Sequence, residues 1–421
     1  MNANVNTYKQ VILDQLQERN EIRLSDLVAR QEETFFDLNS SLAQIVIGVR
    51  RSGKSILCHK VLKQSNIDYA YINFDDERLF GLKADDLNTV LEALYMVYGN
   101  FKYLFCDEIQ NIPSWFLFVN RLLRQKIRLL ITGSNAKLLS NELSTHLTGR
   151  YNQIELFPFS FSEFLLLKNI RANDSSTSGV ARKKAAFEEY ISQGGFPELF
   201  AVKNKKAYIK NLFSSIITRD IQQRFSVRYP ESLRKMADYL TDTVATEISY
   251  KKLAELFSFG STHTAESYVG YLRQAYLLLG VQKFSFKSKE RVRNEKNYAV
   301  DTAFISVGKE GLLEKNFGWR LENVVCVELL RRRNQTLNDV YYYKNGHEVD
   351  FVLHNNNAVV ELIQVSADIS AAKTFKREVN ALLRTAEELH CNNLTLITLN
   401  DNRTFSADGK TINITSIIEW L

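Results

Sequence analysis

One stretch of eight residues constrains the fold of this chain more than any other. Residues 48–55 read Gly-Val-Arg-Arg-Ser-Gly-Lys-Ser, the complete pattern GxxxxGK[ST], and they stand between the apolar run AQIVIG and the helical run ILCHKVLKQ. Glycines let backbone N–H groups wrap a phosphate, and the start of a helix carries a partial positive charge. The pattern predicts a phosphate-binding loop between a buried strand and a helix, with a structural glycine turn as the alternative.

Positions in and just after this loop are predicted to contact a bound nucleotide. Lys54 would supply positive charge to the β- and γ-phosphates, and the hydroxyl of Ser55 would bind Mg²⁺. The predicted contact positions are Gly48, Arg50, Arg51, Ser52, Gly53, Lys54, Ser55 and Ile56.

A second apolar run, KYLFCDE, ends in two carboxylates, Asp107 and Glu108. In parallel sheets, ligands bind beyond the carboxyl ends of the strands, so these residues can meet the phosphate loop there. Asp107 would hold the magnesium ion and Glu108 would polarise the attacking water. Alternatively, the two carboxylates cap the next helix.

Two further segments offer catalytic candidates. Ser134 and Asn135 follow the strand RLLIT, where a small polar side chain would point at the γ-phosphate, and a plain turn is the alternative. Arg150 is a candidate arginine finger, a mobile cation that reaches the γ-phosphate of its own or a neighbouring subunit. The predicted catalytic residues are Glu108, Lys54, Ser134, Asn135 and Arg150.

Strand and helix patterns alternate through the first part of the chain. The runs AQIVIG, YAYINFDD, KYLFCDE and RLLITGS are separated by helical stretches, as in a parallel sheet with helices on both faces. Two short amphipathic helices, VILDQLQERNE and SDLVARQEETFF, are predicted before the first strand. The polar stretch IRANDSSTSG indicates a boundary, so the first domain is placed at residues 1–170.

Composition limits the classes of protein to which the chain can belong. The 421-residue chain is 24% charged with a formal charge of +6, which is too mild to indicate nucleic-acid binding by itself. Its four cysteines form no CxxC pair, so neither a disulfide framework nor a zinc cluster is indicated. Without a secretory signal or a long apolar run, we expect a cytoplasmic protein with no membrane partner.

The middle of the chain has the element order of a winged helix. A short helix ISYKKLAELF, a longer helix THTAESYVGYLRQAYLLLG and a basic alternating ribbon predict such a domain within residues 183–305. Double-stranded DNA binding through this domain and a purely structural or protein-binding role are both left open. The predicted DNA contacts are Thr262, His263, Thr264 and Ser267 on the helix and Lys283, Lys287, Lys289, Arg291 and Arg293 on the ribbon.

These segments together resemble a known family. GVRRSGKS, NFDDER, LFCDE, ITGSNAKLLS and LTGR followed by PFSFSEF are similar in order and spacing to AAA-type ATPases of bacteria and archaea with a C-terminal domain of unknown function. The resemblance implies ATP as the nucleotide and an α/β P-loop NTPase sheet, followed by a helical winged-helix region and a restriction-endonuclease-like α/β domain at residues 306–421. GGFPE from Gly194 and the segment at Arg219 look like further landmarks; Arg219 is either a second-sensor arginine or part of a surface ion pair.

The last domain resembles the PD-(D/E)xK nuclease core with one departure. Glu322 lies in a predicted helix and Asp350 at the start of an apolar strand, but Gln364 and Ser366 stand where that pattern usually has an acid and a lysine. The metal site would lose a carboxylate and the mechanism would lose its cation. The sequence therefore predicts a catalytically degenerate domain that serves as a binding or assembly platform.

Three hypotheses of function follow from these observations. The first is an AAA-type ATPase whose Mg²⁺-dependent cycle moves the winged-helix and nuclease-like domains, on DNA or a protein partner and in an oligomer if Arg150 acts between subunits. The second is a slow nucleotide-gated module that holds DNA or a protein partner in one state. The third, a metal-dependent nuclease, is disfavoured by Gln364 and Ser366.

Overall fold

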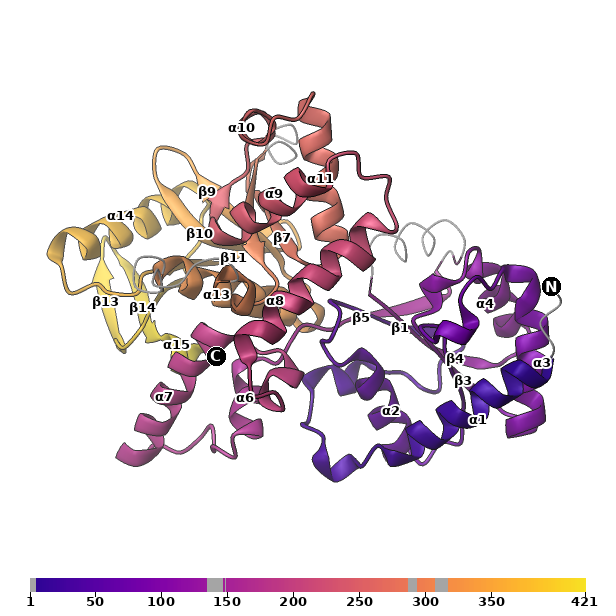
Figure 1. The fold of residues 1–421 in the computed structure, drawn as a ribbon. Helices are drawn as coiled ribbons and strands as arrows, with labels where there is room; N and C mark the ends of the chain where they lie inside the picture. Colours follow the sequence, from indigo (N-terminus) through magenta and orange to yellow (C-terminus); the bar gives the residue numbers. More distant parts are fainter. Residues whose placement is uncertain (1–4, 135–146, 148, 287–293, 307–316) are drawn as a thin grey trace. The chain divides into compact units, whose positions relative to one another are not determined.

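The computed structural model of the protein describes residues 5–134, 147, 149–286, 294–306 and 317–421. It divides into two units, Met1–Leu156 with Gln274–Tyr276, and Phe157–Arg273 with Leu277–Leu421 (Figure 1). The finer division into three domains stays a prediction. Among the described residues, no helix is long and apolar enough to cross a membrane.

The first unit is built on five parallel strands in the order β2-β3-β4-β1-β5. This sheet confirms the α/β class predicted from the alternating pattern. Every residue of β1 is buried, so other elements cover both of its faces. The elements of this unit are α1 (Val5–Glu21), the 3-10 turns η1 (Leu24–Asp26) and η2 (Gln31–Phe35), β1 (Ala43–Ile47), α2 (Lys54–Gln64), β2 (Ala70–Asn73), α3 (Leu87–Tyr98), β3 (Tyr103–Asp107), α4 (Trp115–Arg124), β4 (Arg128–Gly133) and β5 (Tyr151–Glu155).

The strand order brings three functional segments to one edge of the sheet. Strand β4 lies between β1 and β3, so the segments that follow β1, β4 and β3 leave the sheet side by side. Helix α2 packs on one face of the sheet, where Leu57 and Val61 join a core with Val46, Phe105 and Leu130. This packing fixes the start of α2 above the carboxyl end of β1.

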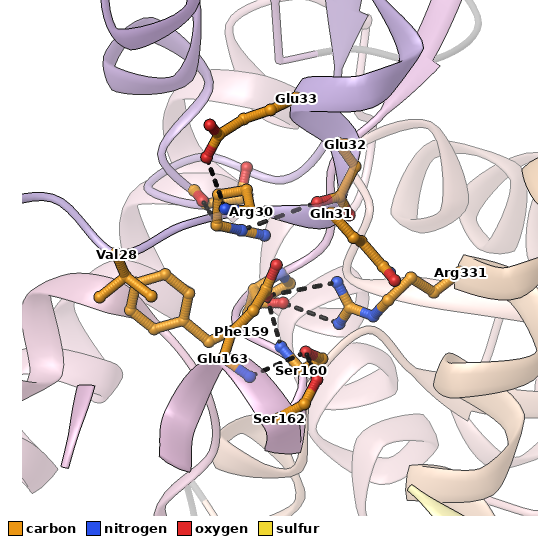
Figure 2. Close-up of polar contacts among 12 residues, drawn as sticks. Val28, Arg30, Gln31, Glu32, Glu33, Phe159, Ser160, Ser162, Glu163 and Arg331 are labelled. Atoms are coloured by element: carbon orange, nitrogen blue, oxygen red, sulfur yellow. Dashed lines mark hydrogen bonds and ion pairs between the residues drawn. The ribbon is translucent and has the colours of Figure 1, made fainter. Parts of the chain in front are cut away.

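The prediction of a second amphipathic helix before the first strand is wrong. Its residues form only the short turns η1 and η2, with extended backbone between them. Figure 2 shows Arg30 beside Glu33, whose Oε1 accepts the backbone N–H of Arg30 at 2.6 Å. Lys60 of α2 donates to Glu33 Oε1 at 2.7 Å and to the carbonyl of Val28 at 3.0 Å. The guanidinium of Arg30 also donates to the carbonyl of Ser52, at 3.2 Å. The bonds from Lys60 and to Ser52 are tertiary, and they override the helical periodicity.

The second unit contains a nine-stranded mixed sheet in the order β13-β14-β12-β11-β10-β9-β7-β8-β6. Because β7 pairs with β9 in parallel, the predicted basic ribbon and the predicted last domain share this one sheet. The elements are α6 (Phe161–Leu167), α7 (Thr177–Gln193), α8 (Lys205–Ser215), the π-helical η8 (Ile216–Gln222), α9 (Pro230–Asp242), β6 (Thr246–Glu247), α10 (Tyr250–Leu256), α11 (Thr262–Gln274), β7 (Leu278–Lys283), β8 (Glu295–Ala299), α13 (Phe317–Thr336), β9 (Asp339–Lys344), β10 (Glu348–Asn355), β11 (Ala358–Val365), α14 (Ala372–Glu388), β12 (Leu394–Thr398), β13 (Arg403–Ala407), β14 (Lys410–Ser416) and α15 (Ile417–Trp420).

The landmark PFSFSEF has a structural role at the start of the second unit. Ser160 and Glu163 form a capping box for α6, with N–H donors to Glu163 Oε2 at 2.8 Å and to Ser160 Oγ at 3.2 Å. Arg331 of α13 approaches Glu163 at 4.0 Å and donates to the carbonyl of Pro158 at 2.8 Å. Figure 2 shows Ser160, Glu163 and Arg331 in this arrangement. Arg331 therefore ties the first residues of the second unit to α13.

The landmark GGFPE is explained by a buried carboxylate. Asp301 accepts the N–H of Gly195 at 2.9 Å and the N–H of Ala303 at 2.8 Å. Gly194 has a φ of +84°, and a Cβ there would lie 1.8 Å from Asp301 Oδ1. A side chain at Gly194 would therefore expel the carboxylate from this position.

Candidate active site

The predicted phosphate loop connects β1 to α2 and depends on two glycines. Gly53 caps α2 with a φ of +97°. Gly48 has a φ of +151°, and a Cβ there would lie 2.1 Å from the carbonyl oxygen of Leu156. Only glycine lets the backbone pass this close to its neighbour. The loop is therefore held tightly at both ends.

Lys54 stands at the first position of α2 with its side chain folded back over the loop. Its ammonium donates to the carbonyls of Gly48 at 3.3 Å and Val49 at 3.2 Å. It also lies 3.8 Å from Glu108 Oε1. With only 4% of the residue exposed, this positive charge is concentrated inside the loop.

Ser55 and Asp107 meet across the sheet edge. Ser55 Oγ donates to Asp107 Oδ1 at 2.9 Å, and the hydroxyl of Thr132 donates to the same oxygen. Tyr71 OH donates to Asp107 Oδ2 at 3.2 Å. Burial, together with the negative charge of Glu108, raises the pKa of Asp107 to about 6. The carboxylate therefore has a set of donors that fixes its orientation.

Glu108 is held in an uncommon backbone conformation at the end of β3. Its φ of +51° places it in the left-handed region, and its N–H donates to Thr132 Oγ1 at 3.0 Å. Such strain in a non-glycine residue persists only where surrounding bonds enforce it. Gln110 donates to Glu108 Oε2 and lies 3.4 Å from Ser134 Oγ. The structure thus brings Glu108 and Ser134 to one place, whereas Asn135 lies outside the described residues.

The other predicted loop positions divide into two groups. Ser52 is fully buried, and within the described part of the chain its hydroxyl makes no hydrogen bond. Arg50 lies 3.8 Å from Asp75 in the loop after β2, whereas Arg51 and Ile56 are exposed. An unpaired hydroxyl buried in the loop is the kind of group that a ligand satisfies.

Arg150 is not brought to this site within one chain. Tyr151 pairs with Ala43 at the start of β1, so Arg150 lies at the opposite end of the sheet from Gly48. At roughly 3.3 Å per residue, the length of β1 separates the two positions by about 16 Å. Its role as an arginine finger stays a prediction, and it needs a second copy of the chain.

Sequence reasoning missed three residues of the site: Tyr71, Gln110 and Thr132. Each hydrogen-bonds to one of the two predicted carboxylates. Tyr71 and Thr132 are polar residues inside apolar strands, and that interruption of the pattern is the signal that could have found them. Gln110 carries no such signal because it lies in a turn.

The oxygen atoms at this edge suit a hard divalent cation. Magnesium is usually bound through one or two protein oxygens together with phosphates and water. Ser55 supplies a hydroxyl and Asp107 a carboxylate, both next to Lys54 at the mouth of the loop. The residues present therefore fit Mg²⁺ bound together with a nucleotide.

Comparison with known proteins identifies the family. Models of three families match successive parts of the chain: an AAA domain at residues 40–165, a domain of unknown function (DUF8612) at 184–308 and a domain of unknown function (DUF4143) at 317–417. An uncharacterized protein of Methanocaldococcus jannaschii is 34% identical over 407 residues, which cover 94% of this chain and 89% of that protein. The chain belongs to this family of AAA-type ATPases. An uncharacterized protein of Haemophilus influenzae is 31% identical over 348 residues, covering 79% of this ATPase and 84% of that protein.

Solved structures with detectable similarity include the RuvB Holliday junction branch migration motor of Thermotoga maritima, with 17% identity, a TM-score of 0.29, and coverage of 66% of this chain and 88% of that one. Cdc6p of Pyrobaculum aerophilum has 16% identity and a TM-score of 0.28, with coverage of 75% of this chain and 94% of that one. With TM-scores this low, the assignment rests on the family matches and on the site itself. In an AAA domain, the loop at residues 48–55 is the candidate nucleotide-binding site.

The second unit brings together Glu322, Asp350 and Gln364 around one cavity, and their assignment to a nuclease-like site stays a prediction. Gln364 Oε1 accepts the N–H of Asp350 at 3.2 Å, and all three residues line a cavity of about 640 Å³ that Ser366 also lines. Burial and the nearby Glu322 raise the pKa of Asp350 to about 8. Ser366 Oγ donates to the carbonyl of Asp368 at 3.2 Å. Sequence reasoning missed Lys296, which reaches both Glu322 and Asp350 from β8.

The predicted DNA-contacting residues are only partly described. Thr262 and His263 are exposed at the start of α11, and Thr264 and Ser267 are half-buried on the same helix. Lys283 ends β7, whereas Lys287, Lys289, Arg291 and Arg293 lie outside the described residues. Arg219 is exposed on η8, and its role as a second sensor stays a prediction.

Proposed function

We propose that this protein binds ATP with Mg²⁺ at the 48–55 loop and hydrolyses it to ADP and phosphate. The observation that carries the proposal is the meeting of a buried ammonium, a hydroxyl and two carboxylates at one edge of a parallel sheet. Lys54 and Ser55 come from α2, and Asp107 and Glu108 come from the end of β3. Neither a glycine turn nor a helix cap requires this combination.

Each residue has a distinct task in this reaction. Lys54 exchanges its loop carbonyls for the β- and γ-phosphate oxygens, and Ser134 contacts the γ-phosphate. Bound Mg²⁺, held by Ser55 and Asp107, would neutralise charge on the same phosphates. Glu108 orients a water whose oxygen attacks the γ-phosphorus in line as the bond to the bridging oxygen of ADP breaks. The proton of the water passes to Glu108 or to the phosphate product, so hydrolysis is balanced.

The contacts of Glu108 favour a second candidate, a slow nucleotide-gated binding module. Its carboxylate is hydrogen-bonded by Gln110 and lies 3.8 Å from Lys54, so it is engaged before any water arrives. ATP would draw Lys54 toward the phosphates and release Glu108 from that ion pair. Turnover would then depend on a partner that also displaces Gln110.

The nucleotide cycle would act on the second unit and its partner. The order α9, β6, α10, α11, β7 and β8 supports a winged helix. Helix α11 buries Ala265, Val269 and Leu272, whereas Thr262, His263 and Glu266 form an exposed face. That exposed face and the ribbon that follows support double-stranded DNA as the partner. A protein partner is the alternative. Arg150 would complete the site of a neighbouring copy in an oligomer.

Steady-state phosphate release with Mg-ATP, with and without duplex DNA, tests the proposal. We expect Glu108→Gln to bind ATP without turnover and Lys54→Ala to lose binding. Glu92→Gln and Lys102→Ala, which change exposed residues away from the site, are matched controls and should behave as wild type. Tight binding without turnover in wild type, with or without DNA, would replace hydrolysis by the gated binding module.

A further inference from the structure

The second unit contains a buried lysine that lies among three carboxylates, two of them buried and the third, Glu348, with 38% of its side chain exposed. The nucleotide site does not use this cluster. The ammonium of Lys296 lies 2.7 Å from Glu348 Oε1, 3.0 Å from Glu322 Oε1 and 3.4 Å from Asp350 Oδ1. Only 3% of its side chain is exposed. The three carboxylates belong to α13 and β10, whereas Lys296 belongs to β8.

Lys296, Glu322 and Asp350 each make further contacts. Tyr298 OH donates to Glu322 Oε1 at 2.8 Å, and the N–H of Val365 donates to Asp350 Oδ2 at 2.9 Å. The ammonium of Lys296 also lies 5.6 Å from the centre of the Tyr342 ring. Although burial disfavours a charged lysine, the three carboxylates raise the pKa of Lys296 above its usual value. The cation is therefore a permanent part of the folded unit.

We propose that Lys296 occupies the position that a divalent cation would take between Glu322 and Asp350, and that this internal counter-ion keeps Mg²⁺ out of the cluster. An ammonium and a metal ion cannot share the same carboxylate oxygens, because the space is filled and the two cations repel. The cavity of about 640 Å³ opens onto these carboxylates, so access is not what excludes the metal.

The same contact joins two parts of the second unit. Strands β7 and β9 lie between β8 and β10 in the sheet, and Lys296 reaches Asp350 beyond them. The predicted ribbon and the predicted nuclease-like domain are then tied by a buried ion pair as well as by the sheet. A domain fixed in this way acts as a rigid platform and not as a metal-dependent nuclease. This inference does not depend on ATP hydrolysis.

Manganese binding tests the proposal, in an Asp107→Asn background that removes the metal ligand of the nucleotide site. We expect titration without nucleotide, followed by electron paramagnetic resonance, to show no Mn²⁺ bound to the parent and a bound ion in Lys296→Met. That ion should also raise the thermal midpoint of Lys296→Met, whose surplus carboxylates destabilise it. Lys296→Arg, which keeps a cation, is the matched control and should bind none.

Two results would overturn the proposal. One is Mn²⁺ bound to the parent and lost in Asp350→Asn, and the other is a folded Lys296→Met that binds no Mn²⁺. If Lys296→Met does not fold, the double variant Lys296→Met with Glu322→Gln replaces it as the test of the counter-ion role, because it removes one of the uncompensated charges. We expect this double variant to fold and to bind no Mn²⁺; failure to fold would contradict the role of Lys296 as a counter-ion.

Discussion

The hydroxyl of Ser55 donates to Asp107 Oδ1 at 2.9 Å and so joins the first turn of α2 to the end of β3. Residues 52 positions apart in the chain thereby form one oxygen cluster beside the phosphate loop. The bond sets the orientation of both groups before a metal or nucleotide arrives. Substitutions at this edge should therefore separate metal-dependent from metal-independent effects on nucleotide binding.

Ser55→Ala removes the proposed magnesium ligand and one of the donors to Asp107. We expect the affinity for Mg-ATP to fall roughly 10- to 100-fold, while the affinity for ATP in the presence of a chelator changes little because Lys54 remains. Fluorescent nucleotide titrations with and without Mg²⁺ measure both quantities. Ser65→Ala, at the exposed far end of α2, is the matched control. Equal losses with and without Mg²⁺ would show that the substitution damages the loop itself.

Thr132 is a positioning residue for both predicted carboxylates. Its hydroxyl donates to Asp107 and accepts the N–H of Glu108. Thr132→Val keeps the shape but removes one donor to Asp107 and the acceptor of the Glu108 N–H. We expect the kcat for ATP to fall about tenfold while KM changes little. Thr132→Ser should restore the rate. A serine variant as slow as the valine variant would point to packing and not to the hydroxyl.

His59 makes the first unit sensitive to acid. It is 2% exposed, and burial, with the positive charges of Lys63 and Arg19, lowers its pKa from 6.5 to about 3. Below pH 6.5 the unfolded chain binds a proton at His59 that the folded chain does not bind. The contribution of His59 to the free energy of unfolding is therefore fully present above pH 6.5 and decreases below it. Between pH 6.5 and 5, we expect the free energy of unfolding of the first unit to fall by about 2 kcal/mol.

Amide hydrogen exchange of α2 as a function of pH measures this effect. His59→Phe should keep the ring packing against Tyr71 and Phe105 and remove the acid sensitivity. His263→Gln changes an exposed histidine and should leave the acid sensitivity unchanged. If His59→Phe loses stability with acid as steeply as wild type, another group carries the proton.

Most of the first unit could be predicted because its signals are local. Four apolar runs became strands β1 to β4, and the phosphate loop lies between a strand and a helix as its pattern requires. The helix at residues 25–36 could not be predicted correctly, because bonds from Lys60 and to Ser52 decide its path. Periodicity carries no information about such distant partners.

The candidate site shows the same division between local and long-range information. Lys54, Ser55, Asp107 and Glu108 were found from motifs, and the sheet brings them together. The position of Lys296 was missed because its partners are 26 and 54 residues away, and the alternation of a ribbon does not show what its buried face meets. Because Ser366 stands where the nuclease-like pattern has a lysine, the sequence predicted a cluster without a cation. Lys296 supplies that cation from another strand.

Arg331 of α13 anchors the first residues of the second unit. Only 2% of its side chain is exposed, and it donates to the carbonyl of Pro158 at 2.8 Å and to Glu328 at 3.2 Å. Lysine keeps the charge but lacks the planar fork that serves both acceptors. We expect Arg331→Lys to lower the free energy of unfolding of the second unit by about 2–4 kcal/mol.

Chemical denaturation followed by hydrogen exchange in α6 and α13 measures this loss. Arg333→Lys is the matched control, because Arg333 lies on the same helix, is 57% exposed and pairs only with Asp339 among the contacts described. An exposed pair of this kind contributes about 1 kcal/mol or less. Equal stability of the two variants would mean that the bond from Arg331 to Pro158 does not stabilise this segment of the second unit.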